Sequence, residues 1–273
     1  MDKPLTPVGT SPLMINIDKT GKTDKVSIMV IINSNAFEVI DGITFRDIEV
    51  PIENKDIGPF LFLVKSKQEG LQSITLNFFQ DGFCIGSIEV NTFVESGNIE
   101  SDPEQSTRIN SFKGTLLSNK LLGSDVTIVI QEVKTNPNFE YKILFYSKDT
   151  PWTDLGPLIF PFNPESKFRD IFKDIENSNL PANIVDDKVK SKGLLLYDEL
   201  FPDRLKDLYW KIKDSIKTVQ IVSTEPWIPW EIIKPYRRLN DGKIEEDLFL
   251  SEKFAISRWI SNKNYNIKKK LAT

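Results

Sequence analysis

The sequence contains no histidine and only one cysteine, Cys84. Without an imidazole the chain cannot form a Ser-His-Asp triad, a Cys-His dyad or a histidine-ligated metal site. A single thiol cannot close a disulfide within the chain. Cys84 stands in "GFCIGSIEV", on the same face of a predicted strand as Ile88 and Val90, which is typical of a core residue. We therefore predict no catalytic residue, no cofactor and no metal site.

Long apolar runs are also missing. No segment reaches the roughly 18 residues that a membrane-spanning helix needs, and the initial "MDKPLTPVGTSPLM" lacks the apolar stretch of a signal peptide. The net charge of −4 gives no general attraction to nucleic acid. Only the end of the sequence is basic, with Lys263, Lys268, Lys269 and Lys270, and we interpret it as a solvated segment. We expect a cytoplasmic protein that binds neither membrane nor nucleic acid.

The first hundred residues have the pattern of short antiparallel strands. Segments such as "VSIMVII", "LQSITLNFF" and "GFCIGSIEV" alternate with Asp-Gly and Gly-Pro turn signals. About seven such segments predict a β-sandwich over residues 11–96, after a flexible tail at 1–10. Within "DKTGKTDK", the stretch "TGKT" (20–23) looks like part of a phosphate-binding loop. A Walker loop would need glycine where Asn16 stands, so a hairpin turn is the preferred interpretation.

Residues 97–122 are mostly polar and rich in Ser and Asn, which predicts a linker, in which "KGTLLSNKLL" can form a short strand or a helical turn. The pattern then changes over 123–273 to the elements of an α/β domain. These are strands at 125–133 and 139–147, an amphipathic helix at 164–178, helices within 183–217 interrupted at Pro202, and a buried strand at 218–224. This order implies some parallel sheet. The predicted fold is thus α+β with two domains.

An unusual concentration of tryptophan and proline occurs in "STEPWIPWEIIKP" (223–235). Pro229 suits the start of a short helix, and Glu231 then meets the positive end of that helix. Trp227 and Trp230 are large, stiff side chains that can anchor the helix on a sheet. We interpret the stretch as a strand-to-helix corner with a structural role, and the alternative is an aromatic ligand-binding site.

The residues after 190 resemble the opening part of CHAT domains, which are prokaryotic caspase-like peptidases of the clan that includes separase. The resemblance covers 190–260 well and 125–190 loosely. It rests on "GLLLYDELFP" from Gly193, on the corner from Glu225 through Pro229 to Ile233, and on Leu250, Phe254, Arg258 and Trp259. The β-rich region ahead is similar to the β-sandwich modules that precede some CHAT domains. The resemblance implies an incomplete caspase-like α/β domain over 123–273.

In that family the catalytic histidine and cysteine come after later strands, so neither residue is carried over to this sequence. The sequence is then an N-terminal fragment, one subunit of a split peptidase, or a member that lost its active half; its end in "NIKKKLAT" favours the first two. The expected function is a non-catalytic scaffold that positions or regulates the peptidase half. The alternatives are a stand-alone adaptor that binds a partner through its β-sandwich and, less favoured, an enzyme working on carboxylates.

An incomplete sheet would leave an open edge and uncovered apolar side chains. We expect this surface in the segment 248–262, where it would bind the missing peptidase half, another subunit or a second copy of the chain. The candidate interface residues are Phe249, Phe254, Ile256, Trp259 and Ile260.

Overall fold

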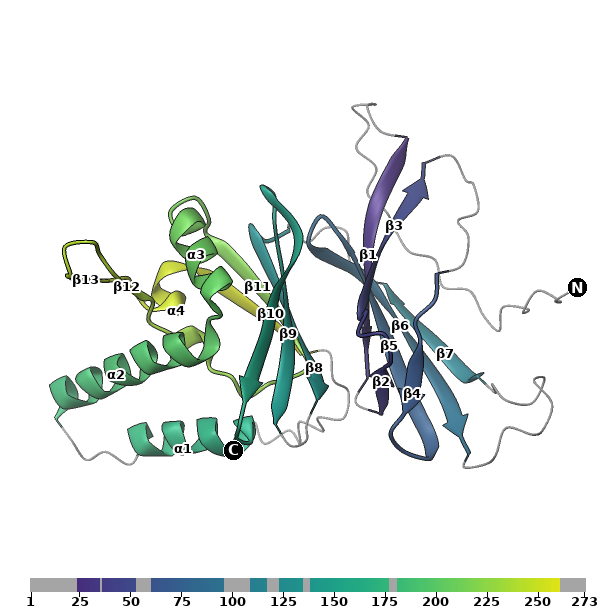
Figure 1. Ribbon diagram of the computed structural model, residues 1–273, viewed down its shortest axis with the longest axis horizontal. Coiled ribbons are helices and arrows are strands. Elements are labelled where there is room, and N and C mark those ends of the chain that lie inside the picture. Colours follow the sequence, from purple (N-terminus) through teal and green to yellow (C-terminus); the bar gives the residue numbers. More distant parts are fainter. Residues whose placement is uncertain are drawn as a thin grey trace, which may run out of the picture. The chain divides into compact units, whose positions relative to one another are not determined.

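The computed structural model describes residues 24–34, 36–52, 60–95, 109–116, 123–134, 138–176 and 181–260. The chain divides into two compact units, residues 1–123 and 124–273 (Figure 1), and each is described by itself. Together they make a mixed α+β protein with several antiparallel sheets. No helix in the described part of the chain is long and apolar enough to cross a membrane.

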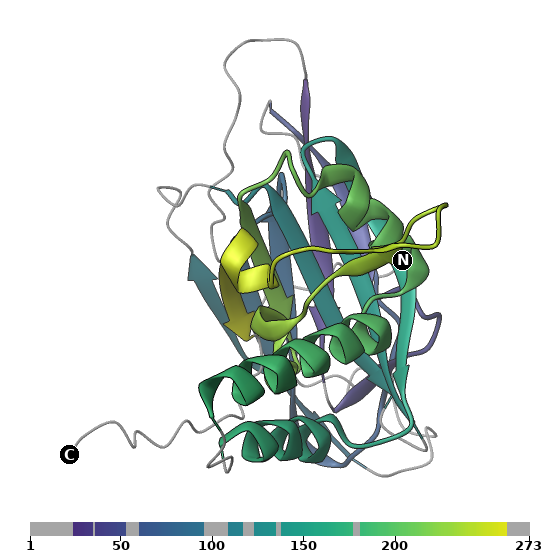
Figure 2. The same cartoon turned by 90° about the vertical axis from the view of Figure 1, so that its left-hand side faces the viewer.

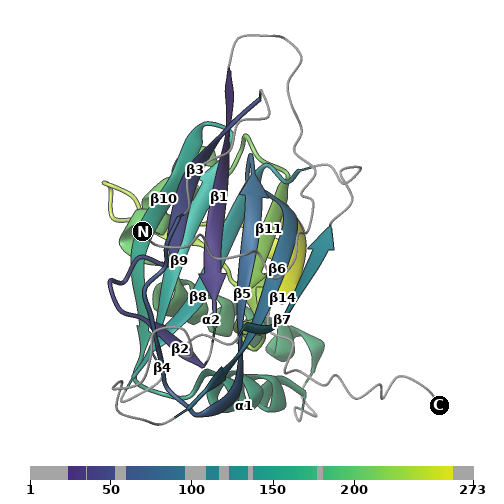
Figure 3. The same cartoon turned by 90° about the vertical axis from the view of Figure 1, so that its right-hand side faces the viewer.

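The first unit is built on a five-stranded antiparallel sheet in the order β3-β1-β5-β6-β7, whose strands are seen side by side in Figure 3. A separate two-stranded ribbon pairs β2 with β4. The strands are β1 (Lys25–Asn33), β2 (Phe37–Val39), β3 (Phe45–Pro51), β4 (Val64–Ser66), β5 (Gly70–Gln80), β6 (Phe83–Val94) and β7 (Ile109–Leu116).

The β5–β6 hairpin follows directly from its turn residues. Asp81 and Gly82 have φ angles of 49° and 73°, and this two-residue turn with positive φ matches the right-handed twist of the strands it joins. The hairpin contributes Phe78 and Ile85 to a small core with Ile28 and Val30 from β1. Cys84 is 1% exposed, so the prediction that it is a core residue is confirmed.

The segment predicted as a linker, 97–122, contains a strand. Ile109–Leu116 forms β7 and pairs with β6 along its length, with a register shift near Asn91. The short strand or turn that the sequence allows from Lys113 overlaps only the second half of β7. The polar composition hides the rest, because an edge strand needs only one paired side and tolerates Ser, Lys and Gly. The predicted strand "LMINI" and the "TGKT" turn lie outside the described residues, as does the tail at 1–10.

The second unit is built on a five-stranded mixed sheet in the order β10-β9-β8-β11-β14. β9 runs antiparallel to both of its neighbours, β10 and β8, whereas β8, β11 and β14 are mutually parallel. The expectation of some parallel sheet is confirmed. The strands are β8 (Val126–Lys134), β9 (Phe139–Ser147), β10 (Thr150–Phe160), β11 (Thr218–Ser223) and β14 (Ala255–Ile260), and a small hairpin pairs β12 (Tyr236–Arg238) with β13 (Ile244–Glu246).

The helices of this unit all lie on one face of its sheet (Figures 1 and 2). They are α1 (Pro164–Glu176), α2 (Ala182–Leu200), α3 (Asp203–Ile212), the 3-10 helix η1 (Trp230–Ile232) and α4 (Leu250–Lys253). Pro202 separates α2 from α3 as predicted, because proline disrupts a helix interior but fits before a first turn. The core between helices and sheet includes the fully buried Phe168, Leu196 and Ile130.

Close contact between α2 and the segment after β11 depends on one glycine. The Gly193 carbonyl accepts a hydrogen bond from the N–H of Lys234 at 3.0 Å. A Cβ at position 193 would lie 2.6 Å from the Ile232 carbonyl oxygen and 2.9 Å from Phe249 Cε1. Such distances are shorter than van der Waals contact, so only glycine allows the helix to approach this closely.

We predict that Gly193→Ala destabilises the second unit by about 1–3 kcal/mol, the usual cost of overpacking a core. Urea unfolding followed by tryptophan fluorescence measures this effect, because all five tryptophans lie beyond residue 123. Gly123→Ala is the matched control, since a Cβ there meets nothing within 4 Å. Equal unfolding midpoints for the two variants would contradict the close-contact argument.

Candidate functional site

A buried carboxylate shapes the corner after β11. Glu225 is 4% exposed, and its two carboxylate oxygens accept hydrogen bonds from the N–H groups of Trp227 at 2.5 Å and Ile228 at 2.9 Å. Ser223 braces the same turn, because its hydroxyl donates to the Glu225 carbonyl and accepts from the Glu225 N–H. The side chain thus satisfies backbone donors that would otherwise be buried without partners.

Burial sets the ionisation of Glu225. Removal from water raises the pKa of this carboxyl from 4.5 to about 7, although the two backbone N–H groups and the nearby Arg258 favour the charged form. Glu132 on β8 acts in the same direction as burial. Glu225 therefore changes its charge near neutral pH, a range in which carboxylates are normally fully ionised.

The corner inserts Trp230 into the core of the unit. This side chain is 1% exposed, and its ring lies 6.4 Å from that of Phe201 at the end of α2. Its indole N–H finds no partner among the described residues, so apolar burial holds it in place. Trp227 is half-buried, with the guanidinium of Arg169 from α1 at 5.3 Å over its ring. These contacts support the structural interpretation of the corner.

Pro229 is buried at the start of the turn, and Glu231 two positions later is half-buried. The sequence predicts that Pro229 starts the short helix, but it immediately precedes η1, which begins at Trp230. Glu231 lies within η1. The helix is only one 3-10 turn, so the expected interaction of Glu231 with a helix dipole is minor. Glu231 instead faces Arg258 of β14, with Oε1 3.6 Å from Nη1.

Arg258 joins the corner to the outermost strand. Its Nη2 donates to the Pro226 carbonyl at 3.0 Å, across 32 positions of sequence. The neighbouring Trp259 is half-buried on the same strand. The family-motif residues from Glu225 to Trp259 are therefore brought together in two adjacent segments, namely the corner and β14.

The two edges of the second sheet differ in how they are protected. β10 carries Pro151 and Pro157, has Gly156 at φ 96°, and shows two register shifts against β9. Prolines and bulges are devices that block further strand pairing. β14 has no proline, pairs with β11 without a register shift, and carries one charged residue, Arg258. Among the described residues, no strand pairs with its outer side.

The predicted interface residues are only partly accessible. Phe254 is 5% exposed and packs against Tyr209, with ring centroids 6.2 Å apart. The expectation that Phe254 belongs to an uncovered surface is therefore wrong, because the turn of α4 directs its ring into the core. Ile256 packs partly on the same core, and Phe249 is half-buried. Ile260 is the most accessible of the set, at 38%.

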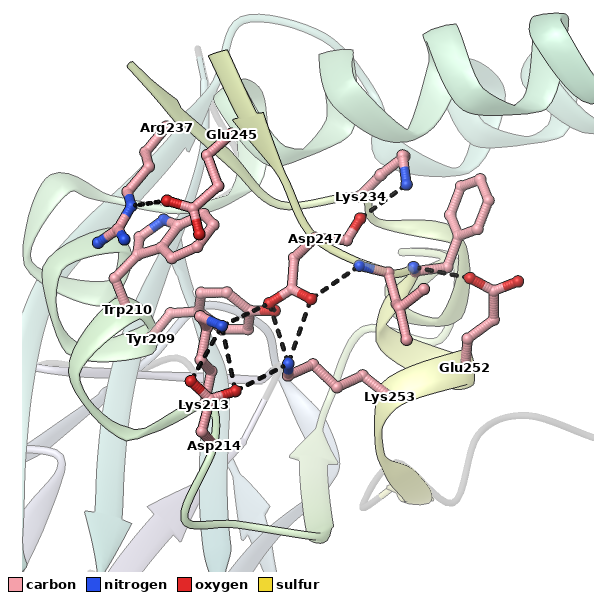
Figure 4. A network of polar contacts seen from close by, with 12 residues as sticks. Tyr209, Trp210, Lys213, Asp214, Lys234, Arg237, Glu245, Asp247, Glu252 and Lys253 are labelled. Carbon is pink, nitrogen blue, oxygen red and sulfur yellow. Dashed lines mark hydrogen bonds and ion pairs between the residues drawn. The ribbon is translucent and has the colours of Figure 1, made fainter. Parts of the chain in front are cut away.

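A polar cluster that sequence patterns did not indicate surrounds Asp247 (Figure 4). Its carboxylate accepts from the Tyr209 hydroxyl at 2.9 Å and pairs with Lys253 at 3.1 Å and Lys213 at 3.4 Å. Both lysines also pair with Asp214. The cluster links α3 to the loop and helix that lead into β14.

Asp247 remains ionised within this cluster. Burial would raise its pKa, but the N–H of Leu248, the Tyr209 hydroxyl and Lys253 together hold the pKa below its ordinary value. A carboxylate whose charge is stabilised in this way is a weak base. We therefore interpret the cluster as a set of ion pairs that holds the end of α3 against the segment before α4, and not as a catalytic group.

A surface groove of about 470 Å³ lies between α2, α3 and β12. Trp210 forms part of it, with the Arg237 guanidinium 4.3 Å over its ring. Arg237 pairs with Glu245, and Lys206 pairs with Asp198. The charged lining of the groove is completed by Asp207, Lys211 and Arg238.

Neither the metal-ligating residue types nor comparison with known proteins indicates a function for the corner or for β14. No group of three or more acidic, cysteine or histidine side chains in the described part of the chain is placed to hold a metal ion. No protein-family model, no curated protein and no solved structure matches the chain. The corner and the β14 edge are therefore interpreted from their own geometry.

We predict that Glu225 dominates the pH dependence of stability between pH 5 and pH 8. The folded chain holds the Glu225 proton more tightly than the unfolded chain, so the free energy of unfolding falls as the pH rises from about 4.5 to about 7. The rise in pKa from 4.5 to about 7 corresponds to at most about 3–4 kcal/mol. No histidine is present to titrate in the same range.

Urea unfolding of Glu225→Gln at pH 5 and pH 8 tests this assignment. The variant should lose most of the difference in unfolding free energy between the two pH values. Glu231→Gln removes a more exposed carboxylate from the same corner and should leave the difference unchanged. An unaltered pH dependence in Glu225→Gln would show that this carboxyl is not the titrating group.

Proposed function

We propose that residues 124–273 form the first part of a CHAT-type, caspase-like domain and serve as a non-catalytic, protein-binding scaffold in the cytoplasm. In this proposal β14 accepts a strand from a protein partner, namely the half that carries the peptidase residues, and the first unit is a β-sandwich module. The order β11, Trp-rich corner, α4 and β14 supports the proposal, because it follows the order of the motifs that resemble the family.

The single observation that carries the proposal is the contrast between the two sheet edges. Proteins commonly protect exposed edge strands with prolines, bulges or lysines. β10 has such protection in Pro151, Gly156 and Pro157, whereas β14 has none. An unprotected edge next to an internally braced corner is suited to strand addition, which is a recurring mode of protein recognition.

The chemistry of the chain favours a binding role over catalysis. The sequence has no histidine, and burial raises the pKa of the Cys84 thiol to about 12. A nucleophilic cysteine needs the opposite, a lowered pKa and an accessible sulfur. The carboxyl of Glu225 has a pKa of about 7, but both of its oxygens accept backbone hydrogen bonds.

A second candidate function is that of an adaptor that binds its partner through the first unit. The ribbon of β2 and β4 favours this alternative, because Ile40, Leu61 and Leu63 beside it are 63%, 70% and 56% exposed. The N–H of Ile40 donates to the Leu63 carbonyl, so the backbones of these two exposed residues are adjacent. Clustered apolar exposure of this kind often marks a protein interface.

We predict that the full chain selects extended peptides from an unbiased displayed library and that their binding depends on β14. Ile260→Lys should weaken the selected peptides about tenfold, because a lysine on an edge strand opposes strand addition. Ile159→Lys is the matched control, since Ile159 is 52% exposed on the opposite edge strand. It should change affinity by less than about twofold.

Three results are distinguishable in this experiment. Binding that Ile260→Lys alone disrupts supports the proposed scaffold. Binding that is lost in Leu61→Lys but kept in Ile260→Lys would favour the adaptor function. Selection that yields no binder, or turnover of casein by the repurified chain that a carboxylate substitution abolishes, would contradict the proposal.

A further inference from the structure

The outer side of β14 presents its backbone groups at alternate residues. The N–H of Ala255 donates to the Lys217 carbonyl at 2.8 Å, so Ala255 directs its backbone groups toward β11. In a parallel ladder this direction alternates along the strand. Ser257 and Trp259 therefore also bond to β11, whereas Ile256, Arg258 and Ile260 direct their N–H and C=O groups away from it.

The same three residues share one side-chain face, because side chains in a strand alternate with a period of two. Ile256 packs on the core between the sheet and the helices, and Arg258 contacts the corner on that side. A strand added to β14 would consequently place its own alternate side chains beside Ile256, Arg258 and Ile260. The chemistry of this row determines which partner fits.

Arg258 is under-satisfied for a partly buried guanidinium. A guanidinium has five N–H donors, but Arg258 makes one hydrogen bond with the described residues, to Pro226. Its Nε is buried and has no hydrogen-bond partner in the part of the chain that the structure describes. Glu231 lies 3.6 Å from Nη1, which is beyond hydrogen-bond distance. The other nearby carboxylate, that of Glu225, is occupied by the N–H groups of Trp227 and Ile228.

A carboxylate is the group that best fits these free donors, because its two oxygens match the geometry of a guanidinium. We propose that β14 selects an extended partner segment in which an aspartate or glutamate lies between two apolar residues, spaced two positions on either side. The acid would bind Arg258, and the apolar residues would cover Ile256 and Ile260. This inference rests on the proposed function, since it requires strand addition at β14.

A second copy of the chain is a poorer occupant of the same edge. Two β14 strands paired about a two-fold axis so that Ile256 of each copy lies opposite Ile260 of the other would place Arg258 directly opposite Arg258 of the other copy. Like charges directly opposite each other destabilise an antiparallel pair. Arg258 therefore disfavours self-pairing while it favours an acidic partner, which combines attraction and repulsion as specific interfaces do.

The test compares displayed peptides of the form apolar-x-Z-x-apolar, with position Z randomised, on the full chain and on its variants. Wild type should enrich Asp and Glu over Asn and Gln at Z by about tenfold, as expected for a charge-assisted hydrogen bond. Arg258→Glu should reverse the preference toward Lys and Arg. Arg258→Gln should abolish the preference for an acid at Z. This variant replaces Arg258→Glu in the test if the charge reversal prevents folding, which is checked by tryptophan fluorescence.

Glu231→Gln provides a further discriminating variant. It removes the carboxylate that lies 3.6 Å from Nη1 of Arg258, so it should strengthen the preference for an acid at Z. Peptides that need an intact β14 but show no preference at Z would overturn this inference and leave the proposed scaffold standing. Peptide binding that is unaffected by Ile260→Lys would contradict both the preference for an acidic partner and the proposed scaffold. Self-association of the wild-type chain that Ile260→Lys abolishes would also contradict both.

Discussion

The hydrogen bonds from the N–H groups of Trp227 and Ile228 to the Glu225 carboxylate are the interaction on which the second unit depends. They fix the direction in which the chain leaves β11. That direction carries Trp230 into the core and brings the Ile232 carbonyl against Gly193 of α2. It also places the Pro226 carbonyl where Arg258 reaches it from β14. A buried carboxylate is costly unless its oxygens are satisfied, and here the backbone satisfies both.

The corner after β11 is also attached to the exposed edge strand β14. Arg258 is held by the corner on one side and belongs to the unprotected strand β14 on the other. The Asp247 cluster fixes the segment that enters α4 and β14, because it attaches that segment to Tyr209 and Lys213 near the end of α3. The edge strand is thus well supported from within the unit, although its outer backbone groups have no partner strand among the described residues.

Much of this architecture could be predicted because its signals are local. The spacing of apolar residues in α1, the interruption at Pro202 and the buried strand at 218–223 each follow from a few neighbouring residues. β10 was missed because Pro151, Gly156 and Pro157 argue against a strand, yet an edge strand with register shifts tolerates all three. The Asp247 cluster and the burial of Phe254 depend on residues distant in sequence, so no local pattern indicated them. The caspase-like assignment itself stays a prediction.

Hydrogen exchange of the β14 amides in the free chain tests the central claim most directly, namely that this strand is paired on one side only. Amides bonded to β11 should be protected, whereas those directed outward should exchange quickly. The predicted result is slow exchange at Ser257 and Trp259 and fast exchange at Ile256, Arg258 and Ile260. Uniform protection of all these amides would contradict the account, because it would mean that the outer edge of β14 is already covered.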